Sequence, residues 1–520
     1  MPVTKTVIVA QLDRLIDWLA LKQKRMWFVA VLLGFVLALG QAPVSFPIGV
    51  FTSIPILGYC AFRVNTWKHA FAVGWWAGFG YFGLSMIWLV EPFFVEPEKH
   101  AILAPFALVA MSGGLALFWG GAFAFSKQFG AGLGRYIIGL AVAWAAVEYL
   151  RSVLFTGFPW GLLGYTWIET PIAQWASVVG PFGLVFMTIF GGLLMLSFPS
   201  KHLAAPMVTV LFFGVLWTAG VWRIPDAGSV QETSIRVRLI QPNAPQHQKW
   251  DPDWMGVFFR RGLELTTAPA KQPVDLVVWP ETSVPFALQD NAGDLQILSD
   301  AAGPRAHIIA GIRRFEADRL YNSMVHLDAK GGLVSVYDKS RLVPFGEYVP
   351  FSQYLSGLGL RGLAANLQGF SAGDGPQVVS AYGLPAYLAM ICYEAIFPWF
   401  VRTRENRPEF LLHITNDAWF GDTIGPFQHL VQVQFRAIEQ GLPAVRSAST
   451  GISAAIDPYG QIVGRLKLNE PGFLDADLPV PLGPTIYAGT GDLPFLLLLF
   501  FLGLASKYVT IRSRKPARDQ

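Results

Sequence analysis

The stretch Tyr387-Leu388-Ala389-Met390-Ile391-Cys392-Tyr393-Glu394 runs from an apolar strand pattern directly into a thiol. Two other stretches have the same form: Val278-Trp279-Pro280-Glu281 ends in a carboxylate, and Tyr337-Asp338-Lys339 ends in an ammonium group. A rigid sheet presents side chains where its strands end, so we expect all three at one edge of an α/β domain. They are 58 and 53 residues apart, so only the fold can bring them together.

Together these side chains provide a nucleophile, a base and a cation. A thiol is mostly protonated at neutral pH, and a carboxylate base beside an ammonium group makes it reactive. Cys392 would attack a carbonyl carbon and Glu281 would take the thiol proton, while Lys339 and the amide after Cys392 would stabilise the oxyanion. Taken singly, a strand-end Glu or Lys is more often solvated or salt-bridged, and a buried Cys is often inert.

The composition predicts a membrane protein. Of 520 residues, 53% are hydrophobic and 14% are charged, with a mean hydropathy of +0.42. The net charge of +4 is mild, and the basic residues form no stripe that would follow a nucleic-acid backbone, so we expect no nucleic-acid partner. The two cysteines, Cys60 and Cys392, lie in different environments, so we expect no structural disulfide. We also expect no metal and no cofactor.

Apolar segments, most of them near the roughly 20 residues that span a bilayer, precede and follow one large polar region. Ala38-Leu39-Gly40 resembles a signal-peptide cleavage site, but the long leader before it favours a retained anchor. The segments lie at about 26–42, 46–62, 69–90, 101–125, 136–155, 177–198, 203–222 and 491–506. The predicted parts are a leader (1–25), a seven-span domain (26–223), a catalytic domain (224–488), an eighth transmembrane helix (489–507) and a basic tail (508–520).

The positions of Lys and Arg predict the topology. They fall in the leader, at Arg63 and Lys68, at Lys127 and Arg135, at Lys201, and in the tail, which are alternate connections. The positive-inside rule then places both termini in the cytoplasm and the polar domain outside it.

The polar domain alternates short apolar strands with helical stretches, which predicts an α/β layered fold with two sheets between helices. Candidate helices lie at about 251–268, 293–301 and 426–440. Candidate strands lie at 235–240, 274–279, 307–313, 324–327, 333–337, 387–391, 410–414, 444–448, 454–457 and 462–466.

The three strings, followed by Thr415-Asn416-Asp417-Ala418-Trp419-Phe420-Gly421-Asp422, resemble the nitrilase superfamily. More narrowly, the chain resembles its membrane-bound branch, the bacterial apolipoprotein N-acyltransferases. The strings that extend this resemblance are Leu342-Val343-Pro344-Phe345-Gly346-Glu347-Tyr348-Val349-Pro350 and Phe155-Thr156-Gly157-Phe158-Pro159-Trp160. The resemblance implies a multi-span α-helical membrane domain and an extracytoplasmic nitrilase-like α-β-β-α sandwich.

The resemblance also implies a reaction and its residues. Glu281, Lys339 and Cys392 would form the catalytic triad. A phospholipid, usually phosphatidylethanolamine, would give its sn-1 acyl chain to the cysteine, and the chain would pass to the α-amino group of an apolipoprotein's diacylglyceryl-cysteine. The protein would lie in the bacterial inner membrane with its catalytic domain in the periplasm, and we expect a monomer. Supporting roles would fall to Trp250, Glu347, Tyr393 and Glu394.

Three of these features have plainer interpretations. Glu347 would hold the Lys339 ammonium in place, or it forms an ordinary surface ion pair. Glu394 would support the nucleophile, or it is an acid favoured at a helix start. The apolar segment 349–360 would be a mobile arm that gates acyl entry through Phe351, Leu355 and Leu358, or it is a buried hairpin.

Two other functions compete with acyl transfer. A membrane-tethered nitrilase-like amidase would use the same triad on a small amide, but one span would suffice as its anchor. A transporter with an external domain would carry several ionisable groups within its spans. Here only Glu148 and Arg151, one helical turn apart, are prominent, and we expect them to pair.

Overall fold

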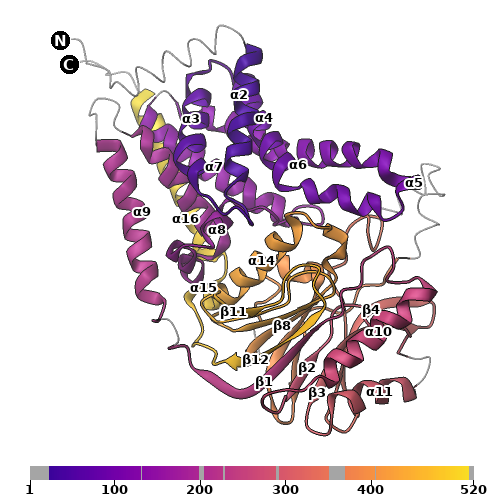
Figure 1. Cartoon of the computed structure of the whole chain (residues 1–520). Helices are drawn as coiled ribbons and strands as arrows, with labels where there is room; N and C mark the ends of the chain where they lie inside the picture. The colour runs from indigo at the N-terminus through magenta and orange to yellow at the C-terminus, as the bar shows by residue number, and fades with distance from the viewer. Residues whose placement is uncertain are drawn as a thin grey trace, which may run out of the picture. The chain divides into compact units, whose positions relative to one another are not determined.

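The computed structural model describes residues 23–130, 132–197, 204–226, 229–288, 292–350, 369–403 and 406–514. The chain divides into two compact units (Figure 1). The first comprises Met1–Ile224 and Ile486–Gln520, and the second is Pro225–Thr485.

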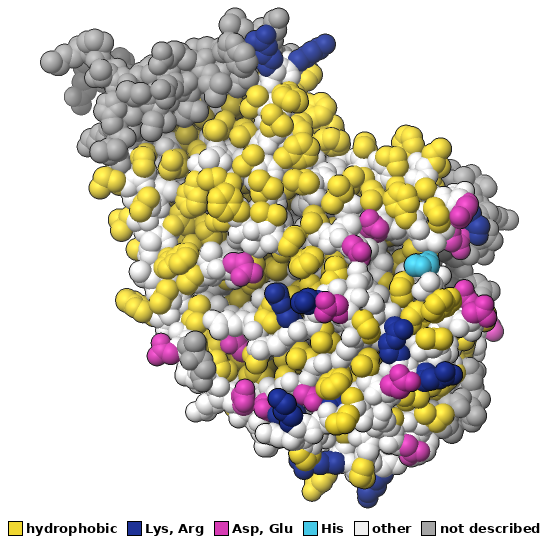
Figure 2. Space-filling model, viewed as in Figure 1, with side chains coloured by type: hydrophobic (Ala, Val, Ile, Leu, Met, Phe, Trp, Pro, Cys, Tyr) yellow, Lys and Arg dark blue, Asp and Glu magenta, His cyan; other side chains and the backbone are white. Residues whose placement is uncertain are grey.

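The first unit is helical, and each predicted apolar segment overlaps one long helix. Many hydrophobic side chains of these helices are exposed (Figure 2). By length and composition, four described helical stretches are apolar enough to cross a membrane, or five if α4 and η1, bent by 49°, form one span. The arrangement of seven spans plus an eighth helix therefore stays a prediction. The long helices are α2 (Gln23–Ala38), α3 (Ile48–Arg63), α4 (Trp67–Ser85), α6 (Ala104–Ser126), α7 (Leu133–Val153), α8 (Ala176–Leu193), α9 (Ala204–Arg223) and α16 (Leu493–Arg514). Short helices are η1 (Ile87–Phe94), α5 (Pro97–His100), η2 (Ala101–Leu103), η3 (Lys127–Phe129), η4 (Leu163–Trp167), η5 (Pro171–Trp175), η6 (Leu194–Leu196) and α15 (Ile486–Thr490).

The expected pair within α7 is present and fully buried. Arg151 Nη2 lies 2.6 Å from Glu148 Oε2, and Trp119 Nε1 donates to the other carboxylate oxygen at 2.6 Å. Arg151 also donates to the carbonyls of Phe158, at 2.7 Å, and Trp160, at 2.9 Å. Because the pair has these additional hydrogen bonds, it braces the loop after α7.

The second unit contains two six-stranded sheets. β1, β2 and β3 run parallel in the first sheet, and β7, β8 and β9 run parallel in the second. The first sheet has the order β12-β1-β2-β3-β4-β5, with β1 (Glu232–Gln241), β2 (Leu276–Val278), β3 (His307–Glu316), β4 (Arg319–Leu327), β5 (Leu333–Asp338) and β12 (Gly472–Pro479). The second has the order β11-β10-β9-β8-β7-β6, with β6 (Val378–Ala381), β7 (Leu384–Ile391), β8 (Phe410–Thr415), β9 (Ala444–Ala448), β10 (Ala454–Ile456) and β11 (Ile462–Arg465).

Helices cover the sheets and form the outer layers (Figure 1). α10 (Pro252–Thr267) and α11 (Ala292–Ala302) pack on the first sheet, and α14 (Gly425–Gln440) packs on the second. At Gly262 of α10, a Cβ atom would lie 2.5 Å from the Trp279 ring, so glycine permits the close approach of this helix to its sheet. The predicted α-β-β-α sandwich is confirmed.

The structure contains every strand and helix predicted for this domain and adds two strands that the prediction omitted. The omitted strands, β6 and β12, lie at the edges of their sheets. In β12, Asp475 and Asp477 pair with Arg238 and Arg236 of β1, so the strand alternates charged with apolar side chains. A search for apolar runs misses such a strand, because its stability comes from cross-strand pairs.

Part of the contact between the two sheets is polar. His326 Nδ1 of β4 lies 3.0 Å from the Tyr387 hydroxyl of β7, and His326 Nε2 lies 3.0 Å from His307 Nδ1. Burial, with a smaller effect of His307, lowers the pKa of His326 to about 4. The ring is therefore neutral at pH 7.

This buried histidine predicts a pH dependence of stability. A lowered pKa means that the unfolded chain binds the proton first as the pH falls, so His326 lowers the free energy of unfolding by about 1.4 kcal/mol per pH unit between roughly pH 6.5 and 4. We expect the unfolding temperature in detergent to decrease from pH 7 to pH 5, and to decrease less in His326→Gln. An unfolding temperature that rises over this range would contradict the prediction.

Candidate functional site

The three predicted residues meet at one buried site in the second unit. Glu281 follows β2 and Lys339 follows β5, both in the first sheet, while Cys392 begins the short helix η7 (Cys392–Ile396) after β7 of the second. Their exposed fractions are 5%, 1% and 7%. Lys339 Nζ donates to Glu281 Oε1 at 3.2 Å. The Cys392 thiol is close enough to both groups for their charges to shift its pKa.

Hydrogen bonds hold the Glu281 carboxylate on both oxygens. Oε1 accepts from Asn322 Nδ2 at 2.6 Å as well as from Lys339, and Oε2 accepts from the Asn416 amide at 2.8 Å. Burial by itself would raise the pKa of Glu281, but the charges of Lys339 and Lys249 outweigh it and hold the pKa below its usual value. Glu281 is therefore an ionised carboxylate whose position is fixed.

Two carboxylates share the Lys339 ammonium group. Its Nζ lies 2.8 Å from Glu347 Oε1 and 3.2 Å from Glu281 Oε1. Glu347 is itself fixed, because its Oε2 accepts from the Val343 amide at 2.8 Å. Burial lowers the pKa of Lys339, but the charges of Glu281 and Glu347 raise it by more, so the pKa lies well above its usual value. The ammonium group therefore stays charged, and the two carboxylates fix its position.

Cys392 is a thiol in this resting arrangement. Burial, followed by the charge of Glu281, raises the pKa of Cys392 to about 12, although Lys339 acts in the opposite direction. The residue has a φ of 49°, in the left-handed region that non-glycine residues seldom adopt. A buried thiol with this pKa needs a base to become a nucleophile, and Glu281 is the ionised carboxylate beside it.

Glu394 joins the segments that carry Lys339 and Cys392. Its Oε1 accepts from the Tyr337 hydroxyl at 2.7 Å and the Ser340 amide at 2.7 Å, and its Oε2 accepts from the Ile391 amide at 2.8 Å. It also lies in the first turn of η7, where an acid is favoured. Its contacts are those of a brace between the ends of β5 and β7.

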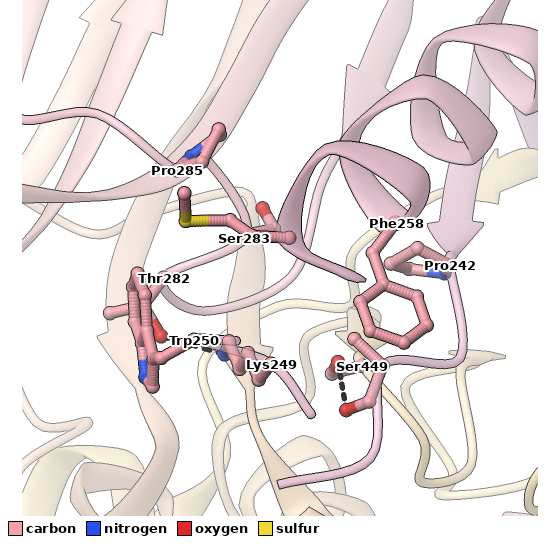
Figure 3. A pocket seen from close by; sticks show the side chains of 10 residues that line it. Pro242, Lys249, Trp250, Phe258, Thr282, Ser283, Pro285 and Ser449 are labelled. Atoms are coloured by element: carbon pink, nitrogen blue, oxygen red, sulfur yellow. Dashed lines mark hydrogen bonds between the residues drawn. The ribbon is translucent and has the colours of Figure 1, made fainter. Parts of the chain in front are cut away.

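A pocket beside the triad contains Trp250 (Figure 3). Lys249 in its wall donates to the Glu281 carbonyl at 2.9 Å and to the Thr282 hydroxyl at 2.7 Å. Burial lowers the pKa of Lys249 to about 8. Trp250 is 37% exposed, and the Arg313 guanidinium lies 4.2 Å from its ring centroid. The lining residues are Pro242, Ala244, Lys249, Trp250, Met255, Phe258, Thr282, Ser283, Pro285 and Ser449.

The remaining predicted residues lie in different places. Tyr393 is buried next to Cys392, with its ring edge-on to that of Phe397 at 5.1 Å between centroids. Phe351, Leu355 and Leu358 of the predicted arm lie outside the described residues. Within the described ranges, no group of three or more His, Cys, Asp and Glu side chains is placed to hold a metal ion.

The sequence did not point to several residues that contact the triad. Lys249 and Asn322 are the clearest cases, since they bind the backbone and the side chain of Glu281. Neither follows an apolar strand, which was the pattern that singled out the triad. Lys249 does precede Trp250, and that adjacency is the signal in the sequence that points to it.

Two family models match the chain. The carbon-nitrogen hydrolase model matches residues 236–485. The model of the apolipoprotein N-acyltransferase N-terminal domain matches residues 33–194. The two matches fall in the second and the first unit, respectively.

Curated relatives match over most of their length. The apolipoprotein N-acyltransferase of Brucella suis biovar 1 (strain 1330) is 35% identical over 510 residues, which covers 94% of this chain and 96% of the relative. The enzyme of that name from Sinorhizobium fredii (strain NBRC 101917 / NGR234) is 38% identical and covers 87% and 90%. Among solved structures, an amidase from Nesterenkonia sp. is 20% identical, with a TM-score of 0.37, and covers 53% of this chain and 100% of the amidase.

Proposed function

The chain belongs to the apolipoprotein N-acyltransferase family, and from this we propose that Cys392 carries a fatty acyl group as a thioester between a phospholipid and an apolipoprotein. The single observation that carries the proposal is the buried contact of Lys339 with Glu281 beside the Cys392 thiol. This site provides the base, the cation and the nucleophile that acyl transfer requires.

In the first step, Cys392 Sγ attacks the carbonyl carbon of the sn-1 ester. Glu281 accepts the thiol proton as the S–C bond forms. The Lys339 ammonium and the Tyr393 amide stabilise the negative charge on the carbonyl oxygen. When the ester C–O bond breaks, Glu281 returns the proton to the departing oxygen, and a lysophospholipid leaves.

In the second step, the α-amino group of the diacylglyceryl-cysteine attacks the thioester carbonyl. The N–C bond forms and the C–S bond breaks, so the product is an amide. Glu281 takes a proton from the attacking amine and passes it to the Cys392 sulfur, which restores the thiol. Because the same carboxylate serves both steps, its fixed position between Asn322 and Asn416 matters to each. Glu347 keeps Lys339 charged through the cycle.

The acyl donor and the cellular location are further parts of the proposal. Helices apolar enough to span a membrane suit a lipid donor, and phosphatidylethanolamine is the donor that we propose. The distribution of Lys and Arg supports a catalytic domain in the periplasm, with both termini in the cytoplasm. We propose that the enzyme acts as a monomer in the bacterial inner membrane.

Steady-state kinetics test whether the reaction has two separate steps. With phosphatidylethanolamine and a diacylglyceryl-cysteine peptide as substrates, we expect parallel lines in double-reciprocal plots, since lysophospholipid leaves before the peptide reacts. Intersecting lines, with no lysophospholipid formed when the peptide is absent, would contradict the thioester route. An amidase would instead release free acid to water from a small amide, so each assay includes that measurement.

A further inference from the structure

Two imidazole rings lie against the backbone carbonyl of the nucleophile. His413 Nε2 is 3.0 Å from the Cys392 carbonyl oxygen, and His429 Nε2 is 3.2 Å from it. His413 comes from β8 and His429 from α14, and both side chains are fully buried. The proposed reaction uses neither ring.

The partner of His413 determines which nitrogen carries its proton. His413 Nδ1 lies 2.9 Å from Arg446 Nη1, and a guanidinium group can only donate. Nδ1 is therefore the acceptor, and the proton of the neutral ring is on Nε2, where it is donated to the Cys392 carbonyl. Burial and the charge of Arg446 lower the pKa of His413, which keeps the ring neutral.

Arg446 is fixed in turn by the fold. It lies directly opposite His413 in the parallel register of β8 and β9. Its Nε donates to the Ile452 carbonyl at 3.1 Å, and its Nη2 forms an ion pair with the buried Asp417. Asp417 Oδ1 also lies 2.9 Å from His429 Nδ1. Each of the three Arg446 nitrogens therefore has a partner, and these contacts fix the guanidinium group against His413.

The Cys392 carbonyl and the Tyr393 amide belong to one planar peptide group. In a trans peptide, the C=O and N–H bonds point in opposite directions, so a group that holds one of them aims the other. The Tyr393 amide is the one that the proposed reaction uses to bind the oxyanion. The backbone at Cys392 also has its unusual φ of 49° just before this peptide.

We propose that His413 is a positioning residue, which holds the Cys392 carbonyl so that the Tyr393 amide points at the oxyanion. This inference rests on the proposed function. It assigns to a buried histidine an effect on the rate of acylation and none on the binding of phospholipid.

Three variants of the full chain test the proposal. The glutamine of His413→Gln keeps an oxygen that can accept from Arg446 and an N–H that can reach the Cys392 carbonyl. The asparagine of His413→Asn is one methylene too short to reach that carbonyl. The leucine of His413→Leu has no hydrogen-bond donor. We expect acylation by phosphatidylethanolamine in detergent, measured by intact mass in a single turnover, to slow on the order of 10²-fold in the Leu and Asn variants. The acylation rate of the Gln variant should stay within roughly 10-fold of the wild-type rate. The phospholipid concentration that gives half of the maximal rate should change little in all three variants.

A matched control separates positioning from stability. His326→Gln alters another fully buried histidine of the same domain, so it should lower the unfolding temperature and leave the acylation rate per folded enzyme unchanged. Equal rates for His413→Gln and His413→Asn, or a wild-type rate in His413→Leu, would overturn the proposal. The Gln and Asn pair decides the question if the Leu variant does not fold. A wild-type chain that forms no acyl-enzyme would instead overturn the proposed function.

Discussion

Glu281→Gln is expected to slow formation of the acyl-enzyme by about 10³-fold or more, because the site loses its base. The substitution nearly preserves shape, but an amide cannot accept the thiol proton. One side of the carboxylate faces the Asn416 amide, and the other faces Asn322 and Lys339, so the new NH₂ group must also meet a donor. The measurement is single-turnover acylation from phosphatidylethanolamine, followed by intact mass.

The control for this variant is Glu470→Gln, which removes an exposed carboxylate of the same domain. Glu470 forms a surface pair with Lys467 at 3.5 Å, and its side chain is 58% exposed. We expect a wild-type acylation rate from this control. If Glu281→Gln also kept the wild-type rate, Glu281 would not be the base.

Lys339→Met should be equally inactive and also less stable. Without the ammonium group, no cation lies between the carboxylates of Glu281 and Glu347. Removal of one partner from a buried ion pair lowers the free energy of unfolding by about 3–5 kcal/mol. The like charges would raise the pKa of one carboxylate, and the oxyanion would lose a cation. We expect a decrease in acylation of about 10³-fold and a lower unfolding temperature in detergent.

Lys467→Met is the matched control for Lys339→Met, since it removes the other half of the exposed pair. It should change neither the rate nor the unfolding temperature measurably. A Lys339→Met enzyme that retains more than a tenth of the wild-type rate would show that Lys339 is not needed for the oxyanion or for the charge state of Glu281.

The triad could be predicted from the sequence because each member follows an apolar strand. This rule works where functional side chains follow strands, because the carboxyl ends of parallel strands lie on the same side of a sheet. The same rule could not find Asn322 or His413, which lie within β4 and β8. Their contacts depend on which strands are neighbours and in what register, and neither can be derived from spacing along the chain.

The two missing strands have a related explanation. β12 is stabilised by ion pairs across to β1, so its residues indicate a strand only when the partner is known. The sequence leaves the roles of Glu347 and Glu394 open for the same reason. A carboxylate is a surface acid or a buried brace according to its neighbours, and here those neighbours are Lys339 for Glu347 and Tyr337 for Glu394.

Intact-mass analysis of the purified enzyme tests the central claim most directly. After incubation with phosphatidylethanolamine, we expect the mass to increase by one acyl chain, with the adduct on Cys392 and lysophospholipid released in equal amount. Addition of a diacylglyceryl-cysteine peptide should discharge the adduct and yield the N-acylated peptide, and Cys392→Ala should show neither change. An adduct on another residue, or turnover by Cys392→Ala at the wild-type rate, would contradict the account.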